Sequence, residues 1–264
     1  MYFPPPSAKV RRFASEFIPA SPTKTHRFSR HPRRSALTCS IVVTPVVWPG
    51  KTHERTGHPS RVTANPTTAV FSAAPHGVSA ALIDRLLTAA EQAETQARVV
   101  DTSADFRYAS ADAYETVYKH AHGAPDRLGE FTCAVPEHLN ALSTPHVAHP
   151  GCFATAVLLA SVPLLALGLV EPRLFVSGVT GSTGSGRQPV AGTHHPQRHS
   201  DMYSYNALGH RHAPEITALA QAASGTQADF AFVPHSGPFA RGIHVTVQAT
   251  LHESMSTHEL VHAL

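Results

Sequence analysis

The chain has 264 residues, enough for one large domain or two small ones, and 42% of them are hydrophobic. Residues 1–62 hold 11 of the 21 Lys and Arg but only two of the 18 acids, so the remainder carries 10 basic and 16 acidic residues. This net acidic remainder argues against a nucleic-acid surface, and no stretch approaches the ~20 apolar residues of a membrane span. We therefore expect a cytoplasmic protein that binds neither nucleic acid nor membrane.

Cysteine usage limits the kinds of site that the chain can build. The three cysteines, Cys39, Cys133 and Cys152, are too few for a disulfide framework, and the odd count fits a reducing compartment. They form no CxxC pair, so we expect no structural zinc site made from thiolates.

The first part of the chain is unusual in composition. Residues 1–34 are rich in Pro, Ser and Arg, and we expect them to be atypical and disordered. Organellar transit peptides share the excess of Arg, but no amphipathic helix is evident, so disorder or a shifted reading frame accounts for the segment better. From about Ser35 to Val47 the residues become apolar and β-branched, which predicts a strand.

An α/β pattern begins at Ala69. Ala69–Ala74 predicts a buried strand, Val78–Gln96 a helix with one apolar face, and Arg98–Asp101 a second strand. A strand–helix–strand order implies a parallel pair joined by a right-handed crossover. We interpret residues 35–148 as an incomplete Rossmann-like, dinucleotide-binding domain, in which ligands lie at the carboxyl ends of the strands.

Residues 149–264 differ in pattern, and we expect an α+β catalytic and substrate domain. The apolar run Ala154–Val170 contains Ser161, Pro163 and Gly168, which predicts two core helices. Strands are expected at Arg173–Val179, Phe230–Val233 and Gly242–Leu251.

The last strand and the last helix of that domain have clear local patterns. Gly242–Leu251 alternates strictly between apolar and polar residues, so one face should be buried and the other exposed to water. Ser256 and Glu259 form a capping box that opens a helix. Only five residues follow Glu259, so we expect this domain to be C-terminally incomplete.

The most informative motif is His149-Pro150-Gly151-Cys152, which is followed at once by an apolar helical run. Pro and Gly shape a turn, so Cys152 should lie at a helix N-terminus. The free N–H groups and the positive end of the helix dipole stabilise a thiolate there. A nucleophilic cysteine needs such a setting; a buried, inert cysteine is the alternative.

A histidine motif follows at Gly209–Ile216. His210 and His212 are two apart, so in an extended segment they would lie on the same side, and one could act as a general acid or base. With 20 histidines in the chain, exposed and unused ones are the alternative. A metal cluster is a further alternative, although the spacing matches no standard zinc motif; it would use His194, His195, His199, His210 and His212.

Two further motifs suggest anion binding. Gly178–Arg187 is a Gly- and Ser-rich loop after a strand, whose backbone N–H groups, around Ser182, Gly184 and Gly186, could hold a phosphate of a cofactor. Arg107 follows the strand that ends at Asp101 and could bind a carboxylate or phosphate bidentately. The alternative for Gly178–Arg187 is a flexible loop that binds nothing. The alternative for Arg107 is a surface salt bridge.

In this order the motifs resemble those of the N-acetyl-gamma-glutamyl-phosphate reductases, members of the semialdehyde dehydrogenase group, over about Ala69 to Leu264. The matching segments are Ala73–Ser79, Val100–Arg107, Pro150–Thr155, Gly181–Arg187 and His210–Ile216. The resemblance implies that Cys152 attacks an acyl phosphate to form a thioester, which NADPH reduces to a semialdehyde. It further implies that His210 is the acid or base, that His212 and Arg107 position the substrate, and that the enzyme is a homo-oligomer.

The chain departs from the family pattern in two places. His149 stands where the family usually has asparagine. The family also opens with a strand and a Gly-x-x-Gly-x-x-Gly turn for the cofactor's pyrophosphate, and residues 1–68 contain no such turn. We therefore expect this chain, apparently truncated at both ends, to bind NADPH poorly by itself.

Three alternatives to a free N-acetyl-glutamyl phosphate reductase in arginine biosynthesis stay open. The first is a reductase acting on glutamyl or aminoadipyl phosphate tethered to an acidic carrier protein, in lysine or arginine synthesis. The second is a catalytically inactive remnant that lacks the cofactor loop. The third is a His-rich metal-binding protein, although we expect no metal.

Overall fold

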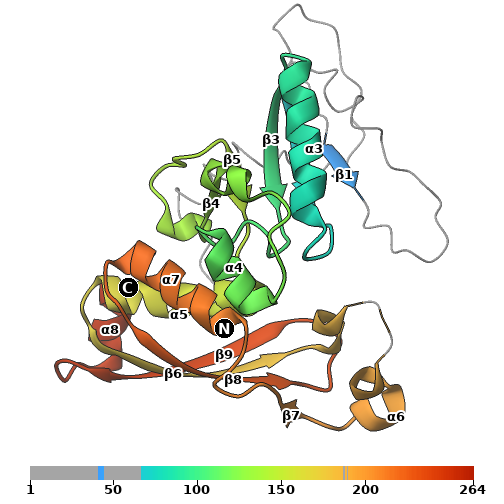
Figure 1. The fold of residues 1–264 in the computed structure, drawn as a ribbon. Helices are drawn as coiled ribbons and strands as arrows, with labels where there is room; N and C mark the ends of the chain where they lie inside the picture. The colour runs from blue at the N-terminus through green and yellow to red at the C-terminus, as the bar shows by residue number, and fades with distance from the viewer. Residues whose placement is uncertain (1–40, 45–66, 187, 189) are drawn as a thin grey trace, which may run out of the picture.

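The computed structural model describes residues 41–44, 67–186, 188 and 190–264, with side chains from residue 69 onward. The described residues form two units, each built on its own sheet (Figure 1). The α/β fold class predicted from the sequence is confirmed. Strand β1, Ile41–Thr44, lies inside the strand predicted over Ser35–Val47, whereas the prediction for residues 1–34 lies outside the described residues.

The first unit is a five-stranded parallel sheet in the order β1-β2-β3-β5-β4. Parallel pairing puts the carboxyl ends of all five strands at one edge, where bound ligands are usually found. Strands β2 to β5 span Thr67–Ser72, Gln96–Asp101, Phe131–Cys133 and His146–Ala148.

Helix α3, Ser79–Gln92, connects β2 to β3 and packs on the sheet through one apolar face. Its buried residues recur at helical spacing, with Ala80, Ile83, Leu87 and Ala90 all nearly inaccessible to solvent. The helix ends four residues earlier than Gln96, the end predicted from the sequence, because Gln96 already pairs in β3 opposite Thr67.

Short elements complete this unit between β3 and β5. Helix α4 spans Ala111–Tyr118, and its N-cap Ser110 accepts a hydrogen bond from the Ala113 amide. Two 3-10 helices, η1 (Pro125–Glu130) and η2 (Pro136–His138), flank β4. Phe106, after β3, stacks on Phe131 with ring centroids 3.9 Å apart, which anchors the segment after β3 in the core.

The second unit is a mixed sheet in the order β7-β8-β6-β9, with β6 parallel to β8 and antiparallel to β9. Helices α5 and α7 cover one face and pack on each other (Figure 1). Strands β6 to β9 span Val170–Thr180, Tyr203–Ser204, Asp229–Ser236 and Ile243–Leu251. Helix α7 spans His212–Ser224, and the remaining short elements are η3 (Ser182–Ser185), η4 (Ala191–Thr193) and α6 (His195–Arg198).

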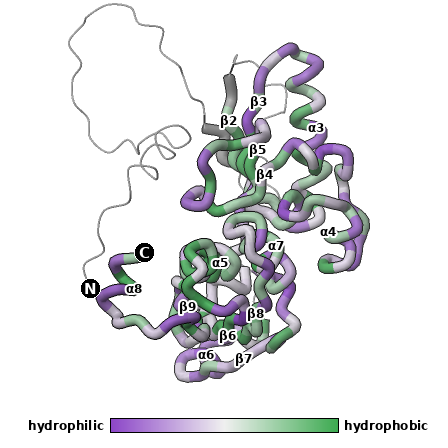
Figure 2. The backbone as a smooth tube through the Cα atoms, turned by 90° about the vertical axis from the view of Figure 1, so that its left-hand side faces the viewer, coloured by the Kyte–Doolittle hydropathy of each residue, from purple (hydrophilic) through white to green (hydrophobic). Residues whose placement is uncertain are grey.

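Helix α5, Cys152–Ala166, corrects one prediction. The sequence predicted two helices over Ala154–Val170, but one helix continues through Pro163, and Val170 already begins β6. The helix is hydrophobic along most of its length (Figure 2), and its packing against α7 and the sheet outweighs the loss of one backbone hydrogen bond at the proline.

Two local predictions for this unit are confirmed. Along β9, half-buried and exposed residues alternate without exception, as the pattern of Gly242–Leu251 predicted. Ser256 and Glu259 form the predicted capping box at the start of α8, Thr257–Ala263. Among the described residues, no helix combines the length and the hydropathy needed to cross a bilayer.

Candidate active site

The turn that carries Cys152 joins β5 to α5. Gly151 is the N-cap of the helix and Cys152 is its first residue, so the predicted helix start is confirmed. Cys152 is exposed to solvent. Cys133, by contrast, is half-buried, and burial is the main cause that raises the pKa of its thiol. Free N–H groups at a helix start stabilise an anion. Cys152 therefore has both the access and the electrostatic setting that a nucleophile requires; Cys39 lies outside the described residues.

Buried side chains from both units hold this turn. The Gly151 amide donates a hydrogen bond of 2.6 Å to Oε1 of Glu215, on α7. Nη1 of Arg107, from the first unit, lies 3.5 Å from Oε2 of the same carboxylate. Arg107 also donates through Nε to the His149 carbonyl at 2.9 Å and through Nη2 to the Thr102 carbonyl at 2.8 Å. The position of the turn is thus set by bonds across the junction of the two units.

Space at the turn is equally restricted. A Cβ atom placed on Gly151 would lie 2.6 Å from Nε2 of His212 and 2.9 Å from Nη1 of Arg107. Contacts this short require the neighbours to move. Glycine at position 151 is therefore explained by crowding rather than by an unusual backbone angle, since its φ is −58°.

The histidine pair differs from the extended segment predicted for it. Arg211 has helical backbone angles, and His212 is the first residue of α7. Both imidazoles are nevertheless buried and lie side by side, with centroids 4.8 Å apart. Burial, with a smaller effect of Arg211, lowers the pKa of His210 to about 4, and burial lowers the pKa of His212 to about 3. Both rings are accordingly neutral near pH 7.

One hydrogen bond assigns the tautomer of His210. Its Nδ1 accepts the backbone N–H of His212 at 3.2 Å, so in the neutral ring the proton is on Nε2. His210 can therefore donate a hydrogen bond through Nε2. Nδ1 of His212 is buried and has no hydrogen-bond partner among the described residues, while Nε2 of the same ring faces the Gly151 turn.

Aromatic rings connect His210 to the cysteine turn. The ring of His210 packs against Phe153, the neighbour of Cys152, at 5.9 Å and against Tyr205 at 5.5 Å. The Tyr205 pKa is raised by burial and, to a smaller extent, by the nearby Cys152. Phe153 fits over Gly178 of β6, where an added Cβ would lie 2.5 Å from its ring. These contacts bring Cys152, His210 and His212 into one site.

The Gly-rich loop lies on the second unit, directly after β6. The Ser182 and Thr183 amides donate to the carbonyls of Phe239 and Ala240, and the Gly184 and Gly186 amides donate within the loop. Ser182 Oγ accepts a hydrogen bond from Arg198 Nε at 3.1 Å. Cofactor binding by Ser182, Gly184 and Gly186 stays a prediction, since these four N–H groups are already bonded; Arg187 lies outside the described residues.

The carboxyl edge of the first sheet has its own closed network. The Gly77 and Ala80 amides, at the start of α3, donate to the two carboxylate oxygens of Asp105 at 2.8 and 2.9 Å. Asp101 is fully buried and accepts from the hydroxyl groups of Ser79 and Ser103. The carboxylate of Asp105 thus occupies the place at the helix start where a phosphate could bind.

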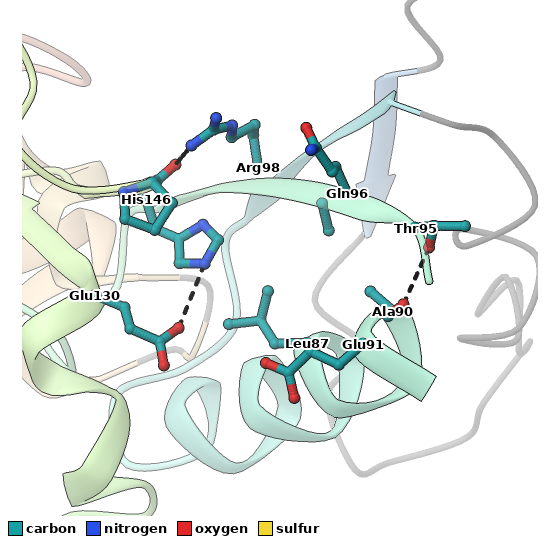
Figure 3. A pocket seen from close by; sticks show the side chains of 10 residues that line it. Leu87, Ala90, Glu91, Thr95, Gln96, Arg98, Glu130 and His146 are labelled. Carbon is teal, nitrogen blue, oxygen red and sulfur yellow. Dashed lines mark hydrogen bonds and ion pairs between the residues drawn. The ribbon is translucent and has the colours of Figure 1, made fainter. Parts of the chain in front are cut away.

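The opposite edge of the same sheet has a cavity of about 320 Å³ between α3 and β3 (Figure 3). Nε2 of His146 faces Oε2 of Glu130 at 3.6 Å, and Arg98 donates to the Pro145 carbonyl. This cavity contains none of the predicted site residues. It lies away from the carboxyl edge, so we assign it no part in the chemistry.

Metal ligation is not indicated by the described residues, which include no group of three or more His, Cys, Asp or Glu side chains placed to hold an ion. Of the proposed histidine cluster, His195 at the start of α6 and His199 just after its end have ring centroids 5.5 Å apart, while His210 and His212 lie beside the turn that carries Cys152.

Two site residues were missed by sequence reasoning. Glu215 lies three residues after His212 and so on the same face of α7, a spacing that could have pointed to it. Tyr205 follows β7 with no distinguishing pattern around it. Both became visible only when the fold brought distant segments together.

Known proteins resemble the chain in sequence. Residues 152–264 match the family model described as semialdehyde dehydrogenase, dimerisation domain. An N-acetyl-gamma-glutamyl-phosphate reductase of Nitrosococcus oceani is 39% identical over 194 residues, which cover 72% of this chain and 55% of that protein. The corresponding protein of Acidithiobacillus ferrooxidans is 38% identical over 190 residues, 71% of this chain and 54% of its own length. The chain thus spans about half the length of these relatives.

Solved structures resemble the chain in fold. Aspartate semialdehyde dehydrogenase II from Vibrio cholerae superposes with a TM-score of 0.52 at 13% identity, covering 76% of this chain and 60% of that one. Aspartate semialdehyde dehydrogenase from Francisella tularensis gives a TM-score of 0.50 at 9% identity, covering 78% and 64%. At such low identity the likeness concerns the fold alone.

Proposed function

Because the chain belongs by homology to the N-acetyl-gamma-glutamyl-phosphate reductase family of the semialdehyde dehydrogenase group, we propose that it reduces N-acetyl-glutamyl 5-phosphate to the semialdehyde. The reaction would use NADPH and serve arginine biosynthesis in the cytoplasm. The observation that carries this proposal is the exposed Cys152 thiol at the first residue of α5, next to the buried pair His210 and His212.

In the first step the Cys152 thiolate attacks the acyl carbon, a carbon–sulfur bond forms, and the bond between the acyl carbon and the phosphate oxygen breaks. Phosphate leaves, and a thioester remains. NADPH, when bound, supplies the hydride that reduces this thioester. The thiolate then departs and the semialdehyde is released.

His210 would act mainly as a donor in this scheme. Its Nε2–H can donate to the substrate's carbonyl oxygen, which becomes more negative as the sulfur attacks. His212 would contact a polar group of the substrate through Nε2, which faces the Gly151 turn, since its Nδ1 is buried. For Arg107 a direct substrate contact is part of the proposal, although its side chain is 5% exposed and its guanidinium is already bonded to the turn.

The described residues do not fit the cofactor's pyrophosphate. At the start of α3 the two N–H groups that face the sheet edge are bonded to Asp105, and the Gly181–Gly186 loop has the four bonded amides described above. We therefore propose that the chain alone binds NADPH weakly. Weak cofactor binding favours the second candidate function, a catalytically inactive remnant of such a reductase.

We also propose that a second copy of the chain covers the outer face of the second sheet. Phe175 is 50% exposed on that face and Leu208 is 69% exposed, and both line a hollow of about 440 Å³. An exposed apolar patch of this kind is typical of an interface, and the match to a dimerisation domain supports the same partner.

Turnover assays distinguish the candidates. The purified chain is assayed in the reverse direction, with the semialdehyde, phosphate and NADP⁺, beside a Cys152→Ser variant. We expect Cys152→Ser to abolish any turnover, with a loss of roughly 10³-fold or more. Absence of turnover from a chain whose Cys152 is normally reactive would favour the remnant. An NADPH dissociation constant in the micromolar range would contradict weak cofactor binding.

A further inference from the structure

The most buried charged group near the nucleophile is the carboxylate of Glu215. The residue is 1% exposed, and it lies in the first turn of α7 with the pair His210 and His212 at the start of the same helix. Burial raises its pKa, and Arg107 acts in the opposite direction. A carboxylate is removed from water at such a position only when several groups compensate it.

Its two oxygens have separate partners. Oε1 accepts the Gly151 amide at 2.6 Å, one residue before Cys152. Oε2 faces Arg107 at 3.5 Å and has no hydrogen-bond partner among the described residues. The first contact orients the residue that precedes the thiol, and the second places a positive charge beside the negative one.

The two charges have opposite effects on the neighbouring sulfur. A carboxylate near Cys152 disfavours a thiolate, whereas a guanidinium near it favours a thiolate. Arg107 would lie only 2.9 Å from a Cβ on Gly151, so both charges are close to the turn. We therefore expect the pair to hold the turn while the two charges act on the sulfur in opposite directions.

We propose that Glu215 is a positioning residue that, paired with Arg107, fixes the Gly151–Cys152 turn relative to α7 and balances the charge beside the thiol. This inference rests on the proposed role of Cys152 as nucleophile. Because α7 begins with His212, the same carboxylate also keeps the histidine pair and the cysteine turn in a constant relation.

The test is the pH profile of Cys152 alkylation by iodoacetamide in the full chain, read residue by residue by mass spectrometry. In Glu215→Gln the amide oxygen can still accept from Gly151, but Arg107 becomes uncompensated. We expect alkylation of Cys152 at pH 7 to become roughly three- to ten-fold faster, with its profile moved to lower pH. In Arg107→Gln the carboxylate is uncompensated, so alkylation should slow by a similar factor.

The double variant Glu215→Gln/Arg107→Gln restores neutrality and should return the profile close to that of the wild type, even where a single variant loses stability. Glu253→Gln, on an exposed residue, is the matched control and should change nothing. Equal profiles in all variants, or shifts of one sign in both single variants, would overturn the proposal, since a merely structural pair would not move the profile in opposite directions.

This readout needs neither NADPH nor an acyl phosphate. If the chain proves inactive as a reductase, the charge balance beside Cys152 can still be measured. If the chain is active but the profiles do not move, the inference about Glu215 fails alone.

Discussion

Two glycine-containing segments of the second unit, both predicted to carry function, are built in opposite ways. The Pro150–Cys152 turn is held by buried side chains from both units, and Gly151 has no room for a Cβ. The Gly181–Gly186 loop is held mainly by hydrogen bonds from its backbone amides to the segment Phe239–Gly242 of the same unit, and Gly186 has open space around it but a φ of +86°.

The difference shows that glycine has two separate uses in this chain. At position 151 it permits close approach of other groups, so its substitution should disturb the neighbours. At position 186 it permits a backbone angle that side chains disfavour, so its substitution should disturb only the loop. The following experiments sharpen or break this contrast between a turn held by contacts from both units and a loop held by contacts within one unit.

The largest effect is expected from Arg107→Met. Removing the guanidinium leaves the Glu215 carboxylate buried and unpaired, which costs about 3–5 kcal/mol of unfolding free energy. Denaturant titration measures the loss, with Arg85→Met on an exposed residue as the control. A loss below 1 kcal/mol would show that the turn does not depend on this contact.

The second-largest effect is expected from acid, which should destabilise the turn. His210 and His212 have folded pKa values of about 4 and 3, lowered from 6.5, so the folded state favours the neutral rings. Their contribution is complete above pH 6.5 and is lost as the pH falls toward 4. Between pH 6.5 and 5 we expect the two histidines to lower the free energy of unfolding by roughly 2 kcal/mol, allowing for partial solvent access. A His210→Gln/His212→Gln variant should show a correspondingly flatter pH dependence.

Gly151→Ala should have a similar or slightly smaller effect. The added methyl group collides with His212 and Arg107, and overpacking of this kind costs about 1–3 kcal/mol. Thermal unfolding and Cys152 alkylation should both change. Gly129→Ala is the control, because a Cβ there would meet no atom within 4 Å. Its free energy of unfolding should stay within roughly 0.5 kcal/mol of the wild-type value.

The smallest effect belongs to the loop. Ser182→Ala removes an acceptor for Arg198 and a donor to the Phe239 carbonyl, at a cost of about 1 kcal/mol. Because these contacts lie within the second unit and none of them involves the Gly151–Cys152 turn, the rate of Cys152 alkylation should not change. A change in that rate comparable to the one expected for Gly151→Ala would show that loop and turn are coupled, against the contrast drawn above.

Local patterns were enough to predict much of the fold. The alternation of Ile243–Leu251, the capping box at Ser256 and the helix start at Cys152 follow from the nearest neighbours in sequence, and the structure confirms all three. Each depends on backbone geometry within one or two turns of chain.

Where predictions failed, contacts distant in sequence decided the outcome. Pro163 was expected to divide α5, but packing on α7 and the sheet keeps one helix. His210 and His212 were expected in an extended segment, yet α7 begins at His212. Glu215 could not be paired with Arg107 from the sequence, because 107 residues separate the two and only the packing of the two units brings them together.

Strand β6 has a consequence beyond its place in the sheet. On one face its Gly178 receives the ring of Phe153, the neighbour of Cys152, and on the other face Phe175 is exposed where we place a second copy of the chain. Only the thickness of one backbone separates the two surfaces. If the proposed site and the proposed interface are both correct, they lie on opposite faces of one strand. Substitutions at Phe153 and Phe175 should then have non-additive effects on Cys152 reactivity and on association of the chain.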